Sequence, residues 1–289
     1  MEPTIPAPST PFGSAKFERG IIAKLSWRIL PLIFLSYLVA VMDRVNISYA
    51  SVQMNANLGF SAAVYGFGAG VFFAGYSLFE IPSNMMLARF GARRWIARIM
   101  LTWGLISGAM AFVQTPTQFY VMRFLLGVAE AGFYPGVLFY LAQWFPAATL
   151  ARAVSRFYIA NPISYMVIGS FAGLLMSLDG TLGVAGWQWM LLVEAIPALV
   201  MAALLLLLLP DRIETTSWLS EPEKDWLHHH HAADHATSGA VQHDFWRTLT
   251  NPVVLGISPP RSAGSIRCTQ NRCASAATRS FRPESMSGQ

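Results

Sequence analysis

Residues 28–50 read RILPLIFLSYLVAVMDRVNISYA, and this stretch decides the class of the protein. It is long enough to cross a bilayer as a helix, because a hydrocarbon core of about 30 Å needs roughly 20 mainly apolar residues. Similar stretches follow along the chain, so the sequence predicts an all-α membrane protein with six transmembrane helices. Their approximate bounds are 28–50, 61–87, 95–114, 117–144, 155–178 and 187–209.

The composition also favours a membrane protein. Of the 289 residues, 54% are hydrophobic and 12% are charged, whereas charged residues make up about 25% of a soluble domain. The net charge of +5 does not predict a nucleic-acid partner, because Lys and Arg form short clusters between apolar stretches. Neither the two cysteines, Cys268 and Cys273, nor the run from His228 to His231 has the spacing of a metal site, so we expect no metal and no cofactor.

The basic residues predict how the helices are oriented. Three alternate loops, SVQMNANLGFSA, QTPTQ and SLDGTLGVAG, contain no Lys or Arg. By the positive-inside rule, the N-terminus and the segment after the sixth span are therefore expected in the cytoplasm. The basic clusters on that side are Lys16, Arg19, Lys24 and Arg28, then Arg89, Arg93 and Arg94, then Arg152 and Arg156.

Four segments make up the predicted domain organisation. Residues 1–27 form a cytoplasmic arm, with the first 20 residues disordered, and 28–210 form the six transmembrane helices. Residues 211–250 form a cytoplasmic linker with a short amphipathic helix, and 251–289 form a tail outside the membrane. From Pro259 to Gln289 there are five Arg and one acidic residue but no apolar run. A shifted reading frame or a natural disordered tail accounts for this composition.

Five ionisable side chains within the predicted spans are candidates for function, because a charge in a bilayer costs several kcal/mol unless it is paired or faces water. Two of them, Asp43 and Arg123, lie roughly 10 Å below the outer surface at about 1.5 Å per residue, which predicts an ion pair. Glu130 follows Arg123 by seven residues and lies on the same helix face, near the middle of the bilayer. The full set is Asp43, Arg44, Glu80, Arg123 and Glu130.

This pairing leaves Arg44 without a partner, because adjacent helical residues point about 100° apart. An unpaired Arg suits a substrate carboxylate, since its planar fork donates two parallel hydrogen bonds. Tyr37 and Ser48 share the helix face of Arg44, and Tyr76 lies on the second span, so these four residues predict a substrate pocket. The alternative is a structural ion network that only fixes the helices in place.

Four motifs follow one another along the chain: MDRVNISYA at 42–50, IPSNMMLARFGARRWIARIMLTWGLIS at 81–107, RFLLGVAEAGFYPG at 123–136 and GWQWMLLVEAIPAL at 186–199. In this order and spacing they resemble the anion:cation symporter family of the major facilitator superfamily, which includes tartrate, phthalate, hexuronate and galactonate permeases. The resemblance covers about residues 20–250. It implies two six-helix halves, each built from inverted three-helix repeats, around a central cavity. This chain would be the N-terminal half, and a C-terminal six-helix half would be its missing partner.

The resemblance implies roles for four of the candidate residues. The residues matching Asp43 and Glu130 take part in proton coupling, the one matching Arg44 holds the substrate anion, and the one matching Arg123 pairs with Asp43. These roles agree with the expectation drawn from depth along the helices.

The loop between the second and third spans matches the superfamily pattern G-x-x-x-D-R-x-G-R-R/K only in part. Asn84 replaces its first Gly and Ala88 replaces its Asp. The change at Ala88 weakens the expectation of an acid-based latch in this loop. The residues of this loop that we assign to the motif are Arg89, Gly91, Arg93 and Arg94.

The sequence therefore predicts a multi-pass transporter of the inner (plasma) membrane that carries a small organic anion, a carboxylate or sugar acid, together with a proton. An anion exchanger or facilitator without proton coupling is one alternative, and a truncated half without activity is another. An enzyme is not expected. Every histidine lies between His228 and His243, so the spans hold no Ser-His dyad, and the chain has no GxxxxGK[ST] motif for ATP.

Overall fold

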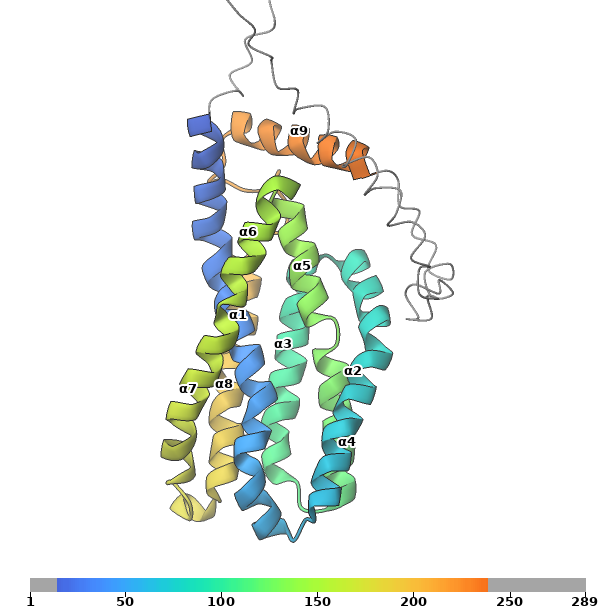
Figure 1. The fold of residues 1–289 in the computed structure, drawn as a ribbon, viewed down its shortest axis with the longest axis vertical. Helices are drawn as coiled ribbons and strands as arrows, with labels where there is room; N and C mark the ends of the chain where they lie inside the picture. The colour runs from blue at the N-terminus through green and yellow to red at the C-terminus, as the bar shows by residue number, and fades with distance from the viewer. Residues whose placement is uncertain (1–14, 239–289) are drawn as a thin grey trace, which may run out of the picture. The chain divides into compact units, whose positions relative to one another are not determined.

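The computed structural model describes residues 15–238, and the secondary-structure elements within that range are all helices (Figure 1). Two short 3-10 turns, η2 (Met110–Phe112) and η3 (Thr181–Gly183), connect longer helices. The α-helices are α1 (Ala15–Leu58), α2 (Ala62–Phe90), α3 (Ala92–Ala109), α4 (Pro116–Glu130), α5 (Phe133–Trp144), α6 (Ala147–Tyr158), α7 (Ala160–Met176), α8 (Gly186–Leu208) and α9 (Glu221–Ser238).

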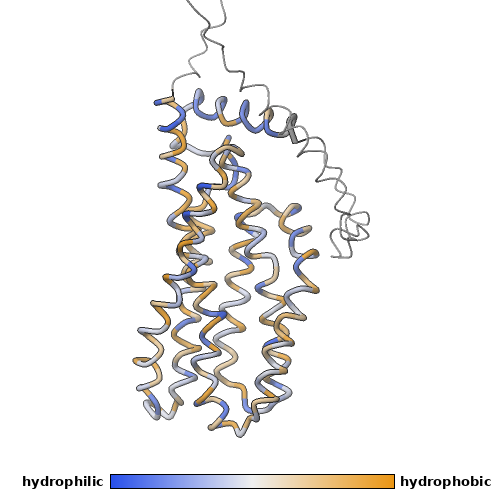
Figure 2. The backbone as a smooth tube through the Cα atoms, viewed as in Figure 1, coloured by the Kyte–Doolittle hydropathy of each residue, from blue (hydrophilic) through white to orange (hydrophobic). Residues whose placement is uncertain are grey.

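Six helical stretches within the described residues are long and apolar enough to cross a membrane, which confirms the predicted fold class. They are α1, α2, α3 with η2, α4 with α5, α6 with α7, and α8. The chain passes up and down the bundle, and α9 lies across the end where α1 begins (Figure 1). We call this end the α9 end. Figure 2 shows that hydrophobic residues recur along the bundle, whereas α9 is mostly hydrophilic.

The predicted N-terminal arm, residues 1–27, differs from the structure, because α1 already begins at Ala15. Ile21 and Leu25 are fully buried, and Lys24 Nζ lies 2.6 Å from Glu223 Oε1 of α9. These contacts extend the first helix beyond its membrane-length part. Residues 1–14 and the predicted tail, 251–289, lie outside the described residues, and the predicted linker, 211–250, is described as far as residue 238.

Close helix packing holds the bundle together: α2 packs against α4, α3 packs against α8, and α1 packs against α7 and α8. Gly127 lets α4 approach α2, because a Cβ at that position would lie 2.1 Å from the carbonyl oxygen of Phe72. Gly75 does the same from α2, where a Cβ would lie 2.6 Å from the carbonyl oxygen of Phe124. Small residues at such crossings are the usual way for transmembrane helices to gain contact.

One membrane-length stretch is interrupted between α4 and α5. Pro135 has no N–H to donate to the carbonyl of Ala131, four residues earlier. The Ser83 hydroxyl donates to this carbonyl instead, at 2.6 Å, and Trp95 Nε1 donates to the Ser83 oxygen at 3.0 Å. Gly132 has a φ of +83°, and a Cβ there would lie 2.4 Å from Ser83 Oγ. The interruption therefore depends on both Pro135 and Gly132. It ends α4 at Glu130, which is one of the predicted site residues.

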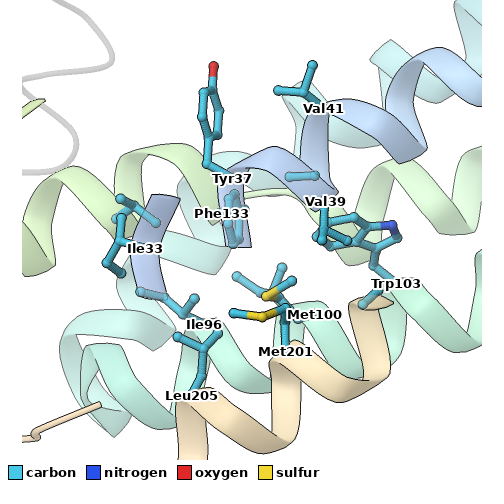
Figure 3. Close-up of a cluster of buried hydrophobic side chains, with 14 of the residues drawn as sticks. Ile33, Tyr37, Val39, Val41, Ile96, Met100, Trp103, Phe133, Met201 and Leu205 are labelled. Atoms are coloured by element: carbon cyan, nitrogen blue, oxygen red, sulfur yellow. The ribbon is translucent and has the colours of Figure 1, made fainter. Parts of the chain in front are cut away.

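A core of buried apolar side chains fills the space where α1, α3, α5 and α8 meet (Figure 3). Trp103 is fully buried there, and Met100 and Met201 lie close together between α3 and α8. The outward-facing side chains are also apolar, as expected for a surface in contact with lipid. Examples with more than half of the side chain exposed are Phe67, Leu78, Phe112, Met166 and Leu207.

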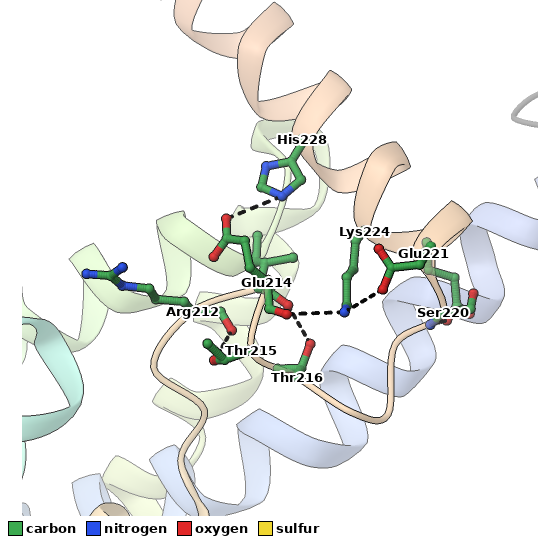
Figure 4. Close-up of polar contacts among 10 residues, drawn as sticks. Arg212, Glu214, Thr215, Thr216, Ser220, Glu221, Lys224 and His228 are labelled. Atoms are coloured by element: carbon green, nitrogen blue, oxygen red, sulfur yellow. Dashed lines mark hydrogen bonds and ion pairs between the residues drawn. The ribbon is translucent and has the colours of Figure 1, made fainter.

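Polar contacts attach α9 to the segment that follows α8 (Figure 4). Lys224 Nζ donates to Glu221 Oε1 at 2.9 Å and to the carbonyl of Glu214 at 3.2 Å. His228 Nε2 lies 3.4 Å from Glu214 Oε1. The buried side chains of Trp226 and Leu227 add an apolar contact on the same helix.

Candidate functional site

A cavity of about 300 Å³ lies beside the middle of α1. Three of the four predicted substrate-binding residues line it, namely Arg44, Tyr37 and Tyr76. The fourth, Ser48, is outside this lining and accepts a long hydrogen bond from Tyr65 Oη at 3.5 Å. The complete lining is Tyr37, Ala40, Val41, Arg44, Tyr76, Phe133, Tyr134 and Tyr158.

Arg44, which lines the cavity, forms an ion pair through its Nη2 with Oε1 of Glu130, which is outside the lining. The Arg44 side chain is 42% exposed, whereas the Glu130 side chain is 1% exposed. Arg44 Cζ also lies 5.5 Å from the ring centre of Tyr76, within the range of a cation–π interaction. The second carboxylate oxygen of Glu130 is buried and has no hydrogen-bond partner. Arg44 is thus open to the cavity, whereas Glu130 is enclosed behind Arg44.

This arrangement corrects the predicted pairing, in which Asp43 bound Arg123 and Arg44 stayed free. No ion pair within 4.0 Å joins Asp43 to Arg123 in the described structure. Asp43 instead faces α3, where it accepts a hydrogen bond from the Ser107 hydroxyl. Because Arg44 points about 100° away from Asp43, it reaches Glu130 at the end of α4.

Arg123 is 5% exposed and lies over an aromatic ring rather than against a carboxylate. Its Cζ is 4.6 Å from the ring centre of Phe72, and its Nε has no hydrogen-bond partner. It is near enough to Asp43 and Glu130 for electrostatic interaction with both. The four predicted charged residues therefore do gather in one region, but with partners different from those expected.

Tyr37 belongs to an aromatic cluster that shapes the other side of the cavity. Its ring centre lies 5.0 Å from that of Phe157 and 5.9 Å from those of Tyr134 and Tyr158. Asn161 Nδ2 donates a hydrogen bond to the Tyr37 hydroxyl at 3.3 Å. A ligand in the cavity would thus meet a guanidinium group, several phenol groups and aromatic faces.

Sequence reasoning missed two ionisable residues within the predicted spans, Arg98 and Glu194. Arg98 Cζ lies 4.0 Å from the ring centre of Trp95. Glu194 is 6% exposed and lies close to Asn46 and Asp43 of α1. The signal was available, because each is a charged residue inside an apolar stretch, and Glu194 is part of the motif GWQWMLLVEAIPAL.

The remaining predicted residues lie outside the cavity. Glu80 lies in α2, and the loop motif forms the turn between α2 and α3. Gly91 has a φ of +87° in that turn, and a Cβ there would lie 3.4 Å from Asp211 Oδ1. Arg93 donates a hydrogen bond to the carbonyl of Leu206 in α8. The loop residues Arg89, Gly91, Arg93 and Arg94 line a second cavity, of about 800 Å³, together with Asp211 and Arg212.

The described residues thus form six membrane-length helices with a cluster of buried charged side chains among them. Residues 33–267 match the family described as the Major Facilitator Superfamily, and the chain belongs to this family. Its members are transporters, in agreement with the expectation that the chain is not an enzyme. The family also places the chain in a membrane as a multi-pass protein.

Relatives of known name are transporters as well. A protein of Agrobacterium vitis named "Putative tartrate transporter" is 48% identical over 241 residues, which cover 83% of this chain and 54% of that protein. A "Quinolone resistance transporter" of Acinetobacter baumannii is 44% identical over 227 residues, which cover 78% of this chain and 52% of that protein. The chain thus spans about half the length of these relatives. The relatives fit the anion:cation symporter family that the motifs indicate.

A solved structure supports the fold. The xylose transporter XylE from E. coli, in an inward-open conformation, is similar with a TM-score of 0.59 and 20% sequence identity. The match covers 76% of this chain and 57% of that chain. The helices of this chain are therefore arranged as in the matched part of that structure.

Proposed function

We propose that the chain forms the N-terminal half of a secondary active transporter that carries a small organic anion, a carboxylate or sugar acid, together with a proton. The observation that carries this proposal is the ion pair between Arg44, which lines the 300 Å³ cavity, and the buried Glu130. Arg44 can bind an anion, and Glu130 can bind a proton.

The anion side of the proposal rests on Arg44. Its side chain is partly exposed at the cavity, and a guanidinium group can bind a carboxylate through two parallel hydrogen bonds. Tyr37 and Tyr76 line the same cavity and add hydroxyl groups that a polyhydroxy acid could use. The name of the 48% identical relative refers to tartrate, a dicarboxylate with two hydroxyl groups, which makes tartrate the first probe to use.

The proton side rests on Glu130. In the observed state its buried carboxylate is paired with Arg44 and has one unpartnered oxygen. When a substrate carboxylate binds Arg44, Glu130 becomes a buried charge without its partner. Such an unpaired buried charge is energetically costly. Uptake of a proton removes that charge. Substrate and proton would thus load together, because each favours the binding of the other.

Charge arithmetic supports the same coupling. Arg44 and Arg123 supply two positive charges, and Asp43 and Glu130 supply two negative charges, so these four groups balance. A bound carboxylate adds one negative charge, and protonation of Glu130 or Asp43 restores the balance. We assign Glu130 the main role because it is the acid that shares Arg44 with the substrate.

The setting of this half is part of the proposal. We propose that the N-terminus and α9 lie in the cytoplasm, as the positive-inside rule favours. We also propose that the membrane is the inner (plasma) membrane. Since the relatives are about twice as long as the matched region, we propose that a second six-helix half completes the cavity.

The test is uptake of radiolabelled tartrate into proteoliposomes with an inwardly directed proton gradient. The 289-residue chain is reconstituted alone and together with the C-terminal half of its relative from Agrobacterium vitis. Arg44→Lys is the matched variant, because it keeps the positive charge and loses the planar fork. A quinolone is the second probe, because one relative is named for quinolone resistance.

Uptake that requires the second half, rises with the proton gradient and falls in Arg44→Lys would support the proposal. Uptake that ignores the gradient would favour an exchanger or facilitator instead. Uptake by neither preparation, together with no tartrate binding, would leave the chain as a half without activity of its own and would reject the proposal.

A further inference from the structure

A third buried acid of the membrane-length helices lies near Asp43 and outside the cavity lining. Glu194 of α8 is 6% exposed, and neither of its carboxylate oxygens has a partner in hydrogen-bond geometry. The nearest polar groups come from α1, where the Asn46 side chain interacts with Glu194 and donates to Asp43 Oδ1 at 3.4 Å. Asn46 is therefore shared by the two acids.

The helices packed against α8 provide no positive charge near Glu194. From α1 the titratable group is Asp43, which has the same sign. From α3 the nearby polar group is the Ser107 hydroxyl, which donates to Asp43. The arginines of α3 lie towards the α9 end, as the bond from Arg93 to Leu206 marks, and Leu206 is about 18 Å along α8 from Glu194. The sequence of α7 contains no Asp, Glu, Lys, Arg or His.

An ionised Glu194 would thus be a buried charge without a counter-ion, beside a second acid. Such a group is strongly disfavoured in a protein interior, and two neighbouring carboxyl groups commonly share one proton for this reason. Glu194 also changes the charge arithmetic, since three acids then face the two cations Arg44 and Arg123. One bound proton restores neutrality before any substrate is present.

We propose that Glu194 is a second proton-binding residue, which holds a proton at neutral pH and exchanges it with its neighbour Asp43. Asp43 lies near Arg123, whereas Glu194 has no such cation, so the proton resides on Glu194. This inference deepens the proposed proton coupling and rests on it for its role in transport.

The transfer is a simple proton movement. The O–H bond of the Glu194 carboxyl breaks and an O–H bond forms on an Asp43 oxygen, so the negative charge moves from Asp43 to Glu194 and nothing is oxidised or reduced. The amide of Asn46 has an acceptor oxygen for the Glu194 hydroxyl and N–H donors for Asp43. It can therefore hold both acids in place before the transfer.

The experiment is infrared difference spectroscopy of the 289-residue chain in lipid nanodiscs, which detects the C=O band of a protonated carboxyl group without any need for transport. Spectra of the wild type, Glu194→Gln and Asp43→Asn are recorded from pH 5 to 9. Glu221→Gln is the matched control, because that side chain is 81% exposed and outside the helical bundle. Circular dichroism confirms that each variant is folded, and Glu194→Asp replaces Glu194→Gln if the latter is not.

We expect a C=O band at pH 7 that is absent in Glu194→Gln, shifted in Glu194→Asp and unchanged in Glu221→Gln. In Asp43→Asn the band should disappear at a lower pH than in the wild type, because the neighbouring negative charge that favours a protonated Glu194 is removed. A band that Glu194→Gln leaves intact would overturn the proposal. Loss of the band on addition of NaCl, but not choline chloride, at constant pH would overturn it in favour of a sodium site.

Discussion

Removal of Arg44 should destabilise the protein mainly by leaving Glu130 unpaired. Loss of one partner from a fully buried ion pair costs about 3–5 kcal/mol, whereas an exposed pair contributes about 0.2–1 kcal/mol. Glu130 is 1% exposed and Arg44 is 42% exposed, so solvent screens one side of this pair. We therefore expect Arg44→Met to lower the free energy of unfolding by about 2 kcal/mol at pH 8, between the two limits.

A double-mutant cycle separates this effect from other contacts of Arg44, such as that with Tyr76. Glu130→Gln removes the charge but keeps the shape of the side chain. In that background Arg44→Met should cost less than about 1 kcal/mol, because no buried charge is left behind. At pH 5 the single variant Arg44→Met should recover part of its stability, since solution supplies a proton to the lone carboxylate.

The assay is reversible unfolding by SDS in mixed micelles, followed by tryptophan fluorescence. Arg44→Met, Glu130→Gln and the double variant are compared with the wild type at pH 5 and pH 8. Strictly additive costs at both pH values would refute the coupling. A cost of Arg44→Met that does not depend on pH would show that the loss comes from packing alone.

Three further predictions follow from other parts of the structure. Gly132→Ala should destabilise the protein by about 2 kcal/mol or more, because Gly132 has a positive φ and a Cβ there would meet Ser83. Gly173→Ala is the control and should be neutral or slightly stabilising, because a Cβ at Gly173 would meet open space. Thermal unfolding of both variants checks this prediction. Arg44→Lys should weaken tartrate binding about 10-fold or more in calorimetry, through loss of a charged hydrogen bond, and wild-type affinity would return Arg44 to a structural role. Burial acts to raise the pKa of Glu223, but hydrogen bonds from Lys24 and Ser220 outweigh burial, so the pKa is lowered. The ionised carboxylate therefore stabilises α9 at any pH above the usual Glu pKa of about 4.3. This contribution, under about 1 kcal/mol because Lys24 is half exposed, should be lost as the pH falls through the lowered value; hydrogen exchange of α9 in the wild type and Glu223→Gln should differ above that pH and converge below it.

The six membrane-length helices could be predicted because a long apolar stretch can satisfy its backbone in lipid only as a helix. The gathering of Asp43, Arg44, Arg123 and Glu130 in one region also followed from their depth along the helices. Their partners did not follow, because depth says nothing about helix rotation. Ser107 of α3 donates a hydrogen bond to Asp43, and the interruption ends α4 at a point where Arg44 can reach Glu130.

The interruption itself was only half visible in the sequence. Pro135 indicates that one carbonyl of the preceding turn lacks its usual donor. The missing donor is supplied by the hydroxyl of Ser83, which precedes Ala131 by 48 residues. This is a tertiary contact, and no local sequence pattern reveals it. The extension of α1 to Ala15 has a similar cause, since the partner of Lys24 is Glu223, 199 residues away.

Glu194 was missed for a different reason. The three-residue spacing between Asp43 and Asn46 puts both on one face of α1, but their neighbour lies on α8 and its register is set by packing against α3. A complete count of charged residues in the apolar stretches would have found Glu194, although not its position beside Asp43.

The central claim is that an anion and a proton bind together at the Arg44–Glu130 pair. The most direct measurement is calorimetry of tartrate binding to the 289-residue chain in lipid nanodiscs from pH 5 to 9, in buffers of different ionisation enthalpy, corrected for the protonation of tartrate itself. We predict net proton uptake on binding, an affinity that falls by roughly 5 to 150-fold as the pH rises, and loss of both effects in Glu130→Gln. Measurable binding with flat affinity and no proton uptake would contradict the claim.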